Sequence, residues 1–125
     1  MREARNWIIP FAPESAAEIM QAMISQETGA YFRMVTSYWD MAATLVNHGA
    51  IDEAMFADAH VEHVLVFSKI EPFLAEIREM MSSPNYLKNL ETLIMKMPDA
   101  KETLAGRREM IKRMVEARRE MAKSN

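Results

Sequence analysis

The 125-residue sequence lacks cysteine altogether and contains only three glycines. Without cysteine, the chain cannot form disulfide bonds, thiolate metal sites or a thiol nucleophile. It also lacks an uninterrupted apolar run of the ~18 residues that a membrane-spanning helix requires. The short apolar piece near the start is broken by Pro10 and Pro13, so it does not resemble a signal peptide. We therefore expect a soluble protein of the cytoplasm, a compartment that keeps thiols reduced.

Recognisable catalytic motifs are also missing. The sequence contains no G-x-S-x-G nucleophile motif, no glycine-rich phosphate-binding loop, no H-E-x-x-H zinc motif and no Glu-x-x-His of di-iron bundles. Its carboxylates lie at spacings typical of solvated, ion-paired helix faces. These patterns predict no catalytic residue and no cofactor, and they favour a non-enzymatic role.

Helix-forming residues, in contrast, are abundant. Hydrophobic residues make up 50% of the chain and charged residues 26%, and 13 residues are methionine, a flexible side chain that fills helical cores and adaptable binding surfaces. No alternating strand pattern or Gly/Ser linker occurs. We predict an all-α fold in one domain spanning residues 1–125, an up-down bundle of four to five helices.

Helical periodicity places five helices after a short arm. Residues 1–12 are predicted to form an irregular apolar arm that packs on the bundle or on a partner chain. Apolar residues then recur at steps of three and four, which predicts helices over residues 13–26, 30–47, 53–81, 83–97 and 100–122. In the second of these helices, the expected inward stripe is Tyr31, Val35, Tyr38, Ala42 and Leu45, widened by Phe32, Trp39 and Val46.

The long third helix is predicted to begin after a sharp turn and to carry a proline kink. Gly49 can adopt the left-handed conformation that ends the preceding helix, and Asp52 can cap the new one. Pro72 removes a hydrogen bond and pushes on the carbonyl of Ser68, so we expect a kink there. The helix carries an unbroken heptad seam of Phe56, His60, His63, Phe67, Ile70, Leu74, Ile77 and Met81.

Two of the three histidines, His60 and His63, belong to this seam and are expected to face inward or toward a partner. Three interpretations are open. The imidazoles can be core residues with hydrogen-bond partners, or they can supply two of the three or four ligands of a metal site. Alternatively, they can line an interface or ligand pocket in which they titrate. His60 and His63 are thus metal-ligand candidates, although the sequence indicates no third ligand beside them.

Residues 99–125 are predicted to form a basic C-terminal helix. Residues 106–123 carry seven basic and three acidic side chains, a net charge of +4, which leaves −7 for the remainder because the whole chain carries −3. Such asymmetry can indicate nucleic-acid binding. However, basic residues near a helix C-terminus also favour the helix dipole, and the acidic remainder offers ion pairs within the protein. The pattern therefore favours pairing within the protein over nucleic-acid binding.

Residues 31–97 resemble an uncharacterised family of small bacterial helical domains of unknown function. The shared pattern is an aromatic-rich helix, a hinge and a long helix that contains an I-x-P-F motif. Because these are packing and turn devices, the resemblance implies a helical fold and supplies no catalytic or binding residue. The matching positions are Gly49, Ile51, Asp52, Ile70, Pro72, Phe73 and Arg78.

The apolar arm, the methionine surplus and the long seam together predict a non-enzymatic helical interaction module that forms a homo-oligomer, most simply a homodimer. Two alternatives remain open. One is a metal- or small-ligand-binding protein or enzyme that uses His60 and His63. The other is a nucleic-acid-associated regulator that acts through the basic C-terminal helix.

Overall fold

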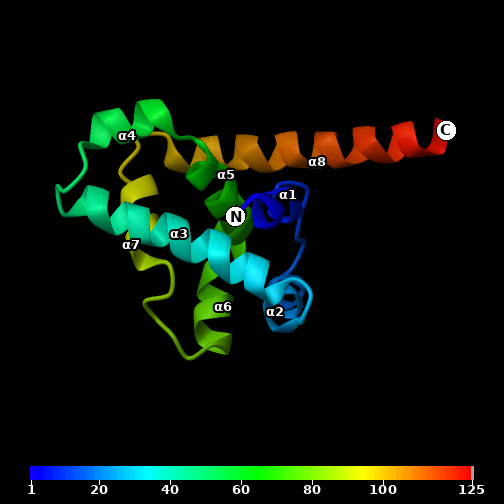
Figure 1. Ribbon diagram of the computed structural model, residues 1–125, viewed down its shortest axis with the longest axis horizontal. Helices are drawn as coiled ribbons and strands as arrows, with labels where there is room; N and C mark the ends of the chain where they lie inside the picture. Colours follow the sequence, from blue (N-terminus) through cyan, green and yellow to red (C-terminus); the bar gives the residue numbers. More distant parts are fainter. Residues whose placement is uncertain (125) are drawn as a thin grey trace.

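Helices account for every regular element of the computed structural model, which describes residues 1–124 (Figure 1). The all-α prediction is confirmed. In the predicted C-terminal segment 99–125, Ala100–Ser124 form the last helix, and Asn125 lies outside the described residues. The elements are α1 (Arg2–Ile8), α2 (Ala16–Ile24), α3 (Gly29–Asn47), α4 (Glu53–Ala59), α5 (Glu62–Ile70), the 3₁₀ turn η1 (Glu71–Phe73), α6 (Leu74–Met80), α7 (Lys88–Ile94) and α8 (Ala100–Ser124).

The turn between α3 and α4 has the geometry that its sequence predicts. Gly49 adopts a φ of +81°, a region that side chains other than glycine rarely occupy. The amide of Ala50 then donates to the carbonyl of Leu45 (2.9 Å), as in a Schellman motif. The Asp52 carboxylate caps α4 by accepting a hydrogen bond from the Met55 amide (2.8 Å).

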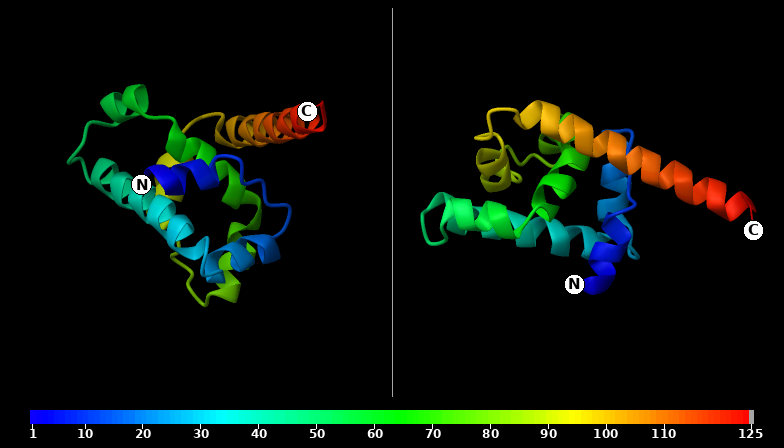
Figure 2. Two further views of the ribbon diagram at one scale, coloured as in Figure 1. Left: turned by 45° about the vertical axis from the view of Figure 1, so that its right-hand side comes forward. Right: turned by 90° about the horizontal axis from the view of Figure 1, so that it is seen from above.

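α5 lies at the centre of the protein, with α7 and α8 packed against it, while α3 packs against α1, α2 and α7. Seven of the nine residues of α5 are buried. α5 and α6 run across the direction of α3 and α8 (Figures 1 and 2). The largest fully buried side chains come from seven helices and include Ile8, Ile19, Phe32, Phe67, Ile70, Ile77, Leu90, Ile94 and Leu104.

The continuous helix predicted over residues 53–81 is divided into α4, α5, η1 and α6. The first break is at His60, whose backbone is extended (φ −137°, ψ 135°). The second is η1, which contains Pro72. α4 packs against α3, whereas α5 packs against α7 and α8. The chain changes direction between these two helices, so tertiary packing overrides the heptad pattern. The predicted count of four to five helices and the simple proline kink are not confirmed.

The N-terminal arm is more ordered than its sequence predicts. We expected an irregular segment, whereas Arg2–Ile8 form α1. Ile8 is buried and Trp7 stacks on Phe11, with ring centroids 4.9 Å apart. The arm thus packs on its own chain, one of the two arrangements that the sequence left open. Within residues 1–124, no helix combines the length and hydropathy that a bilayer crossing needs.

Candidate functional site

The two candidate histidines belong to different helices, yet both rings pack against the same two aromatic side chains, Trp39 and Phe56. His60 ends α4 and is exposed, so it does not face the interior of its own chain, and its placement toward a partner stays a prediction. His63 lies in the first turn of α5 and is 6% exposed, as predicted. Each ring centroid is 5.5 Å from that of Trp39 and 5.0 Å from that of Phe56. We call these four residues the imidazole cluster.

His63 is held in its neutral form. Burial, and to a lesser extent the charge of His60, lower the pKa of His63 to about 4. Desolvation disfavours the imidazolium ion, so the ring is uncharged at pH 7. Its Nδ1 atom is buried and has no hydrogen-bond partner within the described part of the chain. A buried polar atom without a partner is uncommon and marks a place where a water or a ligand group can bind.

The carboxylate of Glu62 ties three helices together beside the imidazole cluster. It accepts a hydrogen bond from Trp39 Nε1 (3.1 Å) and an ion-paired hydrogen bond from Arg5 Nε (2.7 Å). α1, α3 and α5 therefore converge on one acidic side chain. The sequence analysis did not single out Glu62, because nothing in the spacing links it to Arg5, which lies 57 positions earlier.

A metal centre would need ligands beyond the imidazole cluster. Across residues 1–124, no group of three or more His, Asp or Glu side chains is placed to hold a metal ion. Structural zinc sites use four ligands, and catalytic ones keep at least three protein ligands. A metal site built on His60 and His63 therefore stays a prediction that requires ligands from a second molecule.

One exposed face of α3 is apolar and uncharged, while the exposed Arg33 lies about 100° around the helix from Met34. Arg33 and Asp40 are the two charged residues in this 19-residue helix, and Asp40 is turned toward α7, where it accepts a hydrogen bond from the Leu90 amide (2.9 Å). The outward side chains recur at steps of four, three and four, so they share one face. They are Met34, Tyr38, Met41 and Leu45, which are 45%, 45%, 54% and 42% exposed.

Two shallow hollows extend this surface toward His60. The first, of ≈ 220 Å³, is lined by Tyr38, Met41, Leu45, Met55 and His60 among others. The second, of ≈ 440 Å³, shares Tyr38 and His60, reaches Val61 and is also lined by the ion-paired Arg5 and Glu62. Met55 and Val61 are themselves 65% and 59% exposed. We call the combined surface the α3 face; it comprises Met34, Tyr38, Met41, Leu45, Met55 and Val61.

The inward stripe predicted for α3 is confirmed in part. Tyr38 and Leu45 were expected inside but are exposed, whereas five of the other predicted positions are buried as expected: Phe32, Val35, Trp39, Ala42 and Val46. Two neighbouring stripes with the same spacing exist on this helix, and periodicity alone cannot rank them. The sequence did contain a signal for the exposed stripe, namely the two charged residues among the 19 of α3. A helix with so little charge is normally covered by other parts of the protein or by a partner.

The basic side chains of α8 are partly paired within the protein, as expected. Arg108 pairs with Glu71 on η1 (3.4 Å). Lys112 and Lys123 form ion pairs with Glu109 (3.8 Å) and Glu120 (3.6 Å) on α8 itself. Exposed pairs of this kind contribute little stability, but they reduce the positive charge available to a nucleic acid.

Comparison with known proteins gives a family but no activity. Residues 1–97 match the family model described as a domain of unknown function, DUF4760. The match covers α1 to α7, and hence the imidazole cluster and the α3 face. No curated protein and no solved structure matches the chain.

Proposed function

Because the chain belongs to the DUF4760 family, whose domain has no established function, we propose its function from the geometry. The protein is a single-domain, non-enzymatic helical interaction module of the cytoplasm that forms a homodimer through the α3 face. The observation that carries this proposal is the row of exposed, heptad-spaced side chains Met34, Tyr38, Met41 and Leu45 on a helix with two charged residues.

The composition of the α3 face is that of a protein interface. Interface centres are enriched in tyrosine and methionine and depleted of charged residues, and the outward row of α3 has this composition. Contiguous exposed apolar surface on a soluble protein marks an interaction site or an aggregation hazard. The hollows beside Tyr38 and Met55 provide recesses for the side chains of a partner helix.

A second copy of the chain is the partner that this surface suits best. A twofold axis between Tyr38 and Met41 would place Tyr38 against Met41 of the second copy, and Met34 against its Leu45. The outward row of α3 carries no charge, so it can meet its own copy without like charges facing one another. Ile8, Trp7 and Phe11 of the apolar arm, which also suggested dimerisation from sequence, pack within their own chain, while Met1 and Arg5 of the arm border the second hollow.

Disulfide trapping tests this arrangement, since the chain has no cysteine of its own. We expect Met41→Cys, close to the proposed axis, to give a covalent dimer under mild oxidation. Ile24→Cys is the matched control: Ile24 lies on α2 and is 77% exposed. Equal dimer yields from the two variants at the same protein concentration would show random collision and would count against the proposed dimer.

One observation favours a second candidate, a metal- or small-ligand-binding role for His60 and His63. The unpartnered Nδ1 belongs to His63, which lines a hollow of ≈ 200 Å³ together with Phe56, Leu93 and Ile94. Metal analysis of untagged protein separates the two functions. Stoichiometric zinc, iron, nickel or manganese that is lost in His63→Ala would support the second candidate over the first.

A further inference from the structure

α8 leaves the body of the protein partway along its length (Figures 1 and 2). Its buried residues, Ala100, Leu104 and Ile111, all lie in its first half, and residues 112–124 contain none. At 1.5 Å per residue, these last 13 residues extend about 20 Å. The family match ends at residue 97, so all of α8 lies outside it.

The first half of α8 is firmly attached, which fixes the direction of the second half. Leu104 is fully buried. Arg108 Nη1 donates hydrogen bonds to the Ser68 carbonyl (3.0 Å) and to Glu71 (3.4 Å). A helix of about 13 residues is marginal in water without packing. The projecting half therefore gains most of its stability from a partner or from continuity with the attached half.

An apolar seam runs along the exposed side of α8. Met110, Met114, Ala117 and Met121 are separated by steps of four, three and four, and the three methionines are 40%, 39% and 67% exposed. This seam lies on a different face from Leu104 and Ile111, which pack on the body. Heptad-spaced apolar residues with charged flanks are the pattern of a helix that pairs with another helix.

From this seam and its flanking charges, we infer that the α8 helices of two copies pair in antiparallel orientation. Met110 then faces Met121 of the second copy, and Met114 faces Ala117. In this register the flanking Arg113 lies opposite Glu120 of the second copy, and by symmetry the attractive pair forms twice. A parallel pairing would instead bring Arg113 next to Arg118 of the second copy, a repulsive contact. The charges thus select the antiparallel form.

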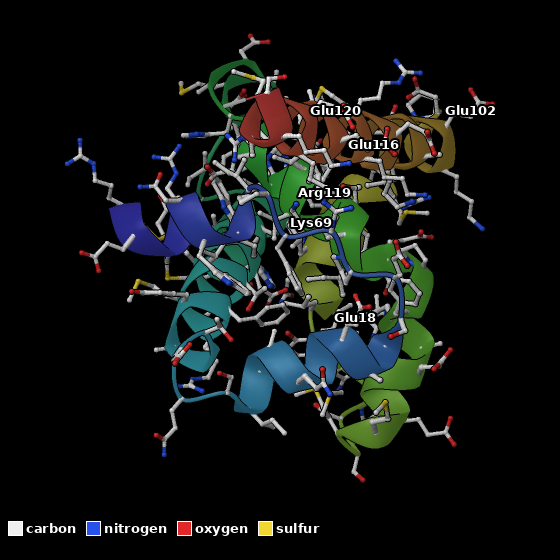
Figure 3. The ribbon with its side chains drawn as sticks, turned by 90° about the vertical axis from the view of Figure 1, so that its right-hand side faces the viewer. Glu18, Lys69, Glu102, Glu116, Arg119 and Glu120 are labelled. Atoms are coloured by element: carbon white, nitrogen blue, oxygen red, sulfur yellow. The ribbon has the colours of Figure 1, made fainter. Side chains whose placement is uncertain are left out.

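Arg119 provides a control position on the same helix. Figure 3 shows Arg119 on the side of α8 that faces the body. At 100° per residue it lies roughly 140–180° around the helix from the seam residues. Arg119→Glu makes the same change of net charge as Arg113→Glu, but at a position that the second α8 does not reach.

The test uses the full-length chain with Met41→Glu as the parent, because that substitution disables the α3 face. Sedimentation velocity over a concentration series then reports association through α8 alone. We expect the parent to self-associate, Arg113→Glu and Glu120→Arg each to weaken its association about tenfold, and the double exchange to restore it. Arg119→Glu should associate as the parent does, and Met114→Glu should abolish association.

Three results would overturn this inference, and none depends on the α3 face. The first is a parent that stays monomeric across the whole concentration series. The second is a double exchange that fails to restore what each single exchange loses. The third is salt-dependent binding of the parent to a DNA fragment that is lost on Arg118→Ala and Arg119→Ala, without self-association, which would identify a nucleic-acid surface instead.

Discussion

Arg108 donates a hydrogen bond from Nη1 to the carbonyl oxygen of Ser68, 3.0 Å away. This carbonyl is the acceptor that Pro72, four residues later, leaves without a helical donor, because proline has no N–H. The same guanidinium contacts Glu71 in η1 (3.4 Å). An arginine of α8 therefore completes the backbone hydrogen bonding of the central helix α5, and it couples the projecting helix to the core.

A double-mutant cycle tests this coupling. Arg108→Ala should lower the free energy of unfolding by about 1–3 kcal/mol, because it leaves the buried Ser68 carbonyl unpaired. In a Pro72→Ala background, the new N–H at position 72 can serve that carbonyl, so the same substitution should cost less. Urea unfolding of the four proteins gives the coupling energy. Identical losses in both backgrounds would show that Arg108 does not serve this acceptor.

The buried His63 predicts a loss of stability in mild acid. Its pKa is about 4 in the folded chain and 6.5 in an unfolded one. Between these values the unfolded chain binds a proton that the folded chain does not. The free energy of unfolding is therefore not reduced by protonation of His63 above pH 6.5. It falls by up to about 3 kcal/mol as the pH drops to 4.

Urea unfolding at several pH values, compared with His63→Gln, isolates this contribution. The glutamine variant does not titrate in this range, so carboxylates that do titrate cancel in the difference between the two proteins. We expect the difference in unfolding free energy to change steadily between pH 6.5 and 4. A difference that is constant with pH would mean that His63 is as accessible to protons in the folded chain as in the unfolded one.

Phe67 tests the position of the core. Its side chain is fully buried on α5, so Phe67→Ala should remove about 3–5 kcal/mol of stability. Met80→Ala is the control, because Met80 is 53% exposed on α6 and should change stability by less than about 0.5 kcal/mol. Similar effects of the two substitutions on chemical denaturation would place Phe67 outside the core.

Two glycines should respond to alanine in opposite directions. A Cβ at Gly29 would lie 2.5 Å from the carbonyl oxygen of Met23, so the backbone must shift and stability should fall by about 1–3 kcal/mol. At Gly106, within α8, a Cβ meets no atom within 4 Å. Gly106→Ala should raise stability by about 0.5–1 kcal/mol through helix propensity. Thermal melts of both variants give the two signs.

Features governed by short-range signals could be predicted from the sequence. The turn at Gly49 and Asp52 follows from residues within a few positions of each other, and the extent of α8 follows from its composition and from Pro98 before it. The start of α2 was also readable. Ser15 Oγ accepts a hydrogen bond from the Glu18 amide (3.2 Å), and the two residues have the spacing of a capping box. We nevertheless predicted that this helix begins at residue 13, which is too early.

Features set by packing could not be predicted in the same way. Residues 53–70 have a continuous helical pattern, yet the break at His60 depends on where α3, α7 and α8 lie. For the same reason, the sequence predicted an inward or partner-facing position for both histidines, whereas His63 is buried within its own chain and His60 is exposed. The imidazole rings of His60 and His63 both contact Trp39, which lies more than 20 positions earlier in the sequence. No local sequence pattern predicts such a contact.

The mass of the untagged chain in solution is the most direct test of the proposed function. By light scattering, at a protein concentration below that at which Met41→Glu self-associates through α8, we expect about twice 14.4 kDa for the natural sequence. Met41→Glu should lower this mass clearly, since a buried carboxylate at the centre of the α3 face disfavours the dimer. Ile24→Glu should leave the mass unchanged. A mass of 14.4 kDa for the natural sequence at every concentration tested, with no effect of Met41→Glu, would contradict the account.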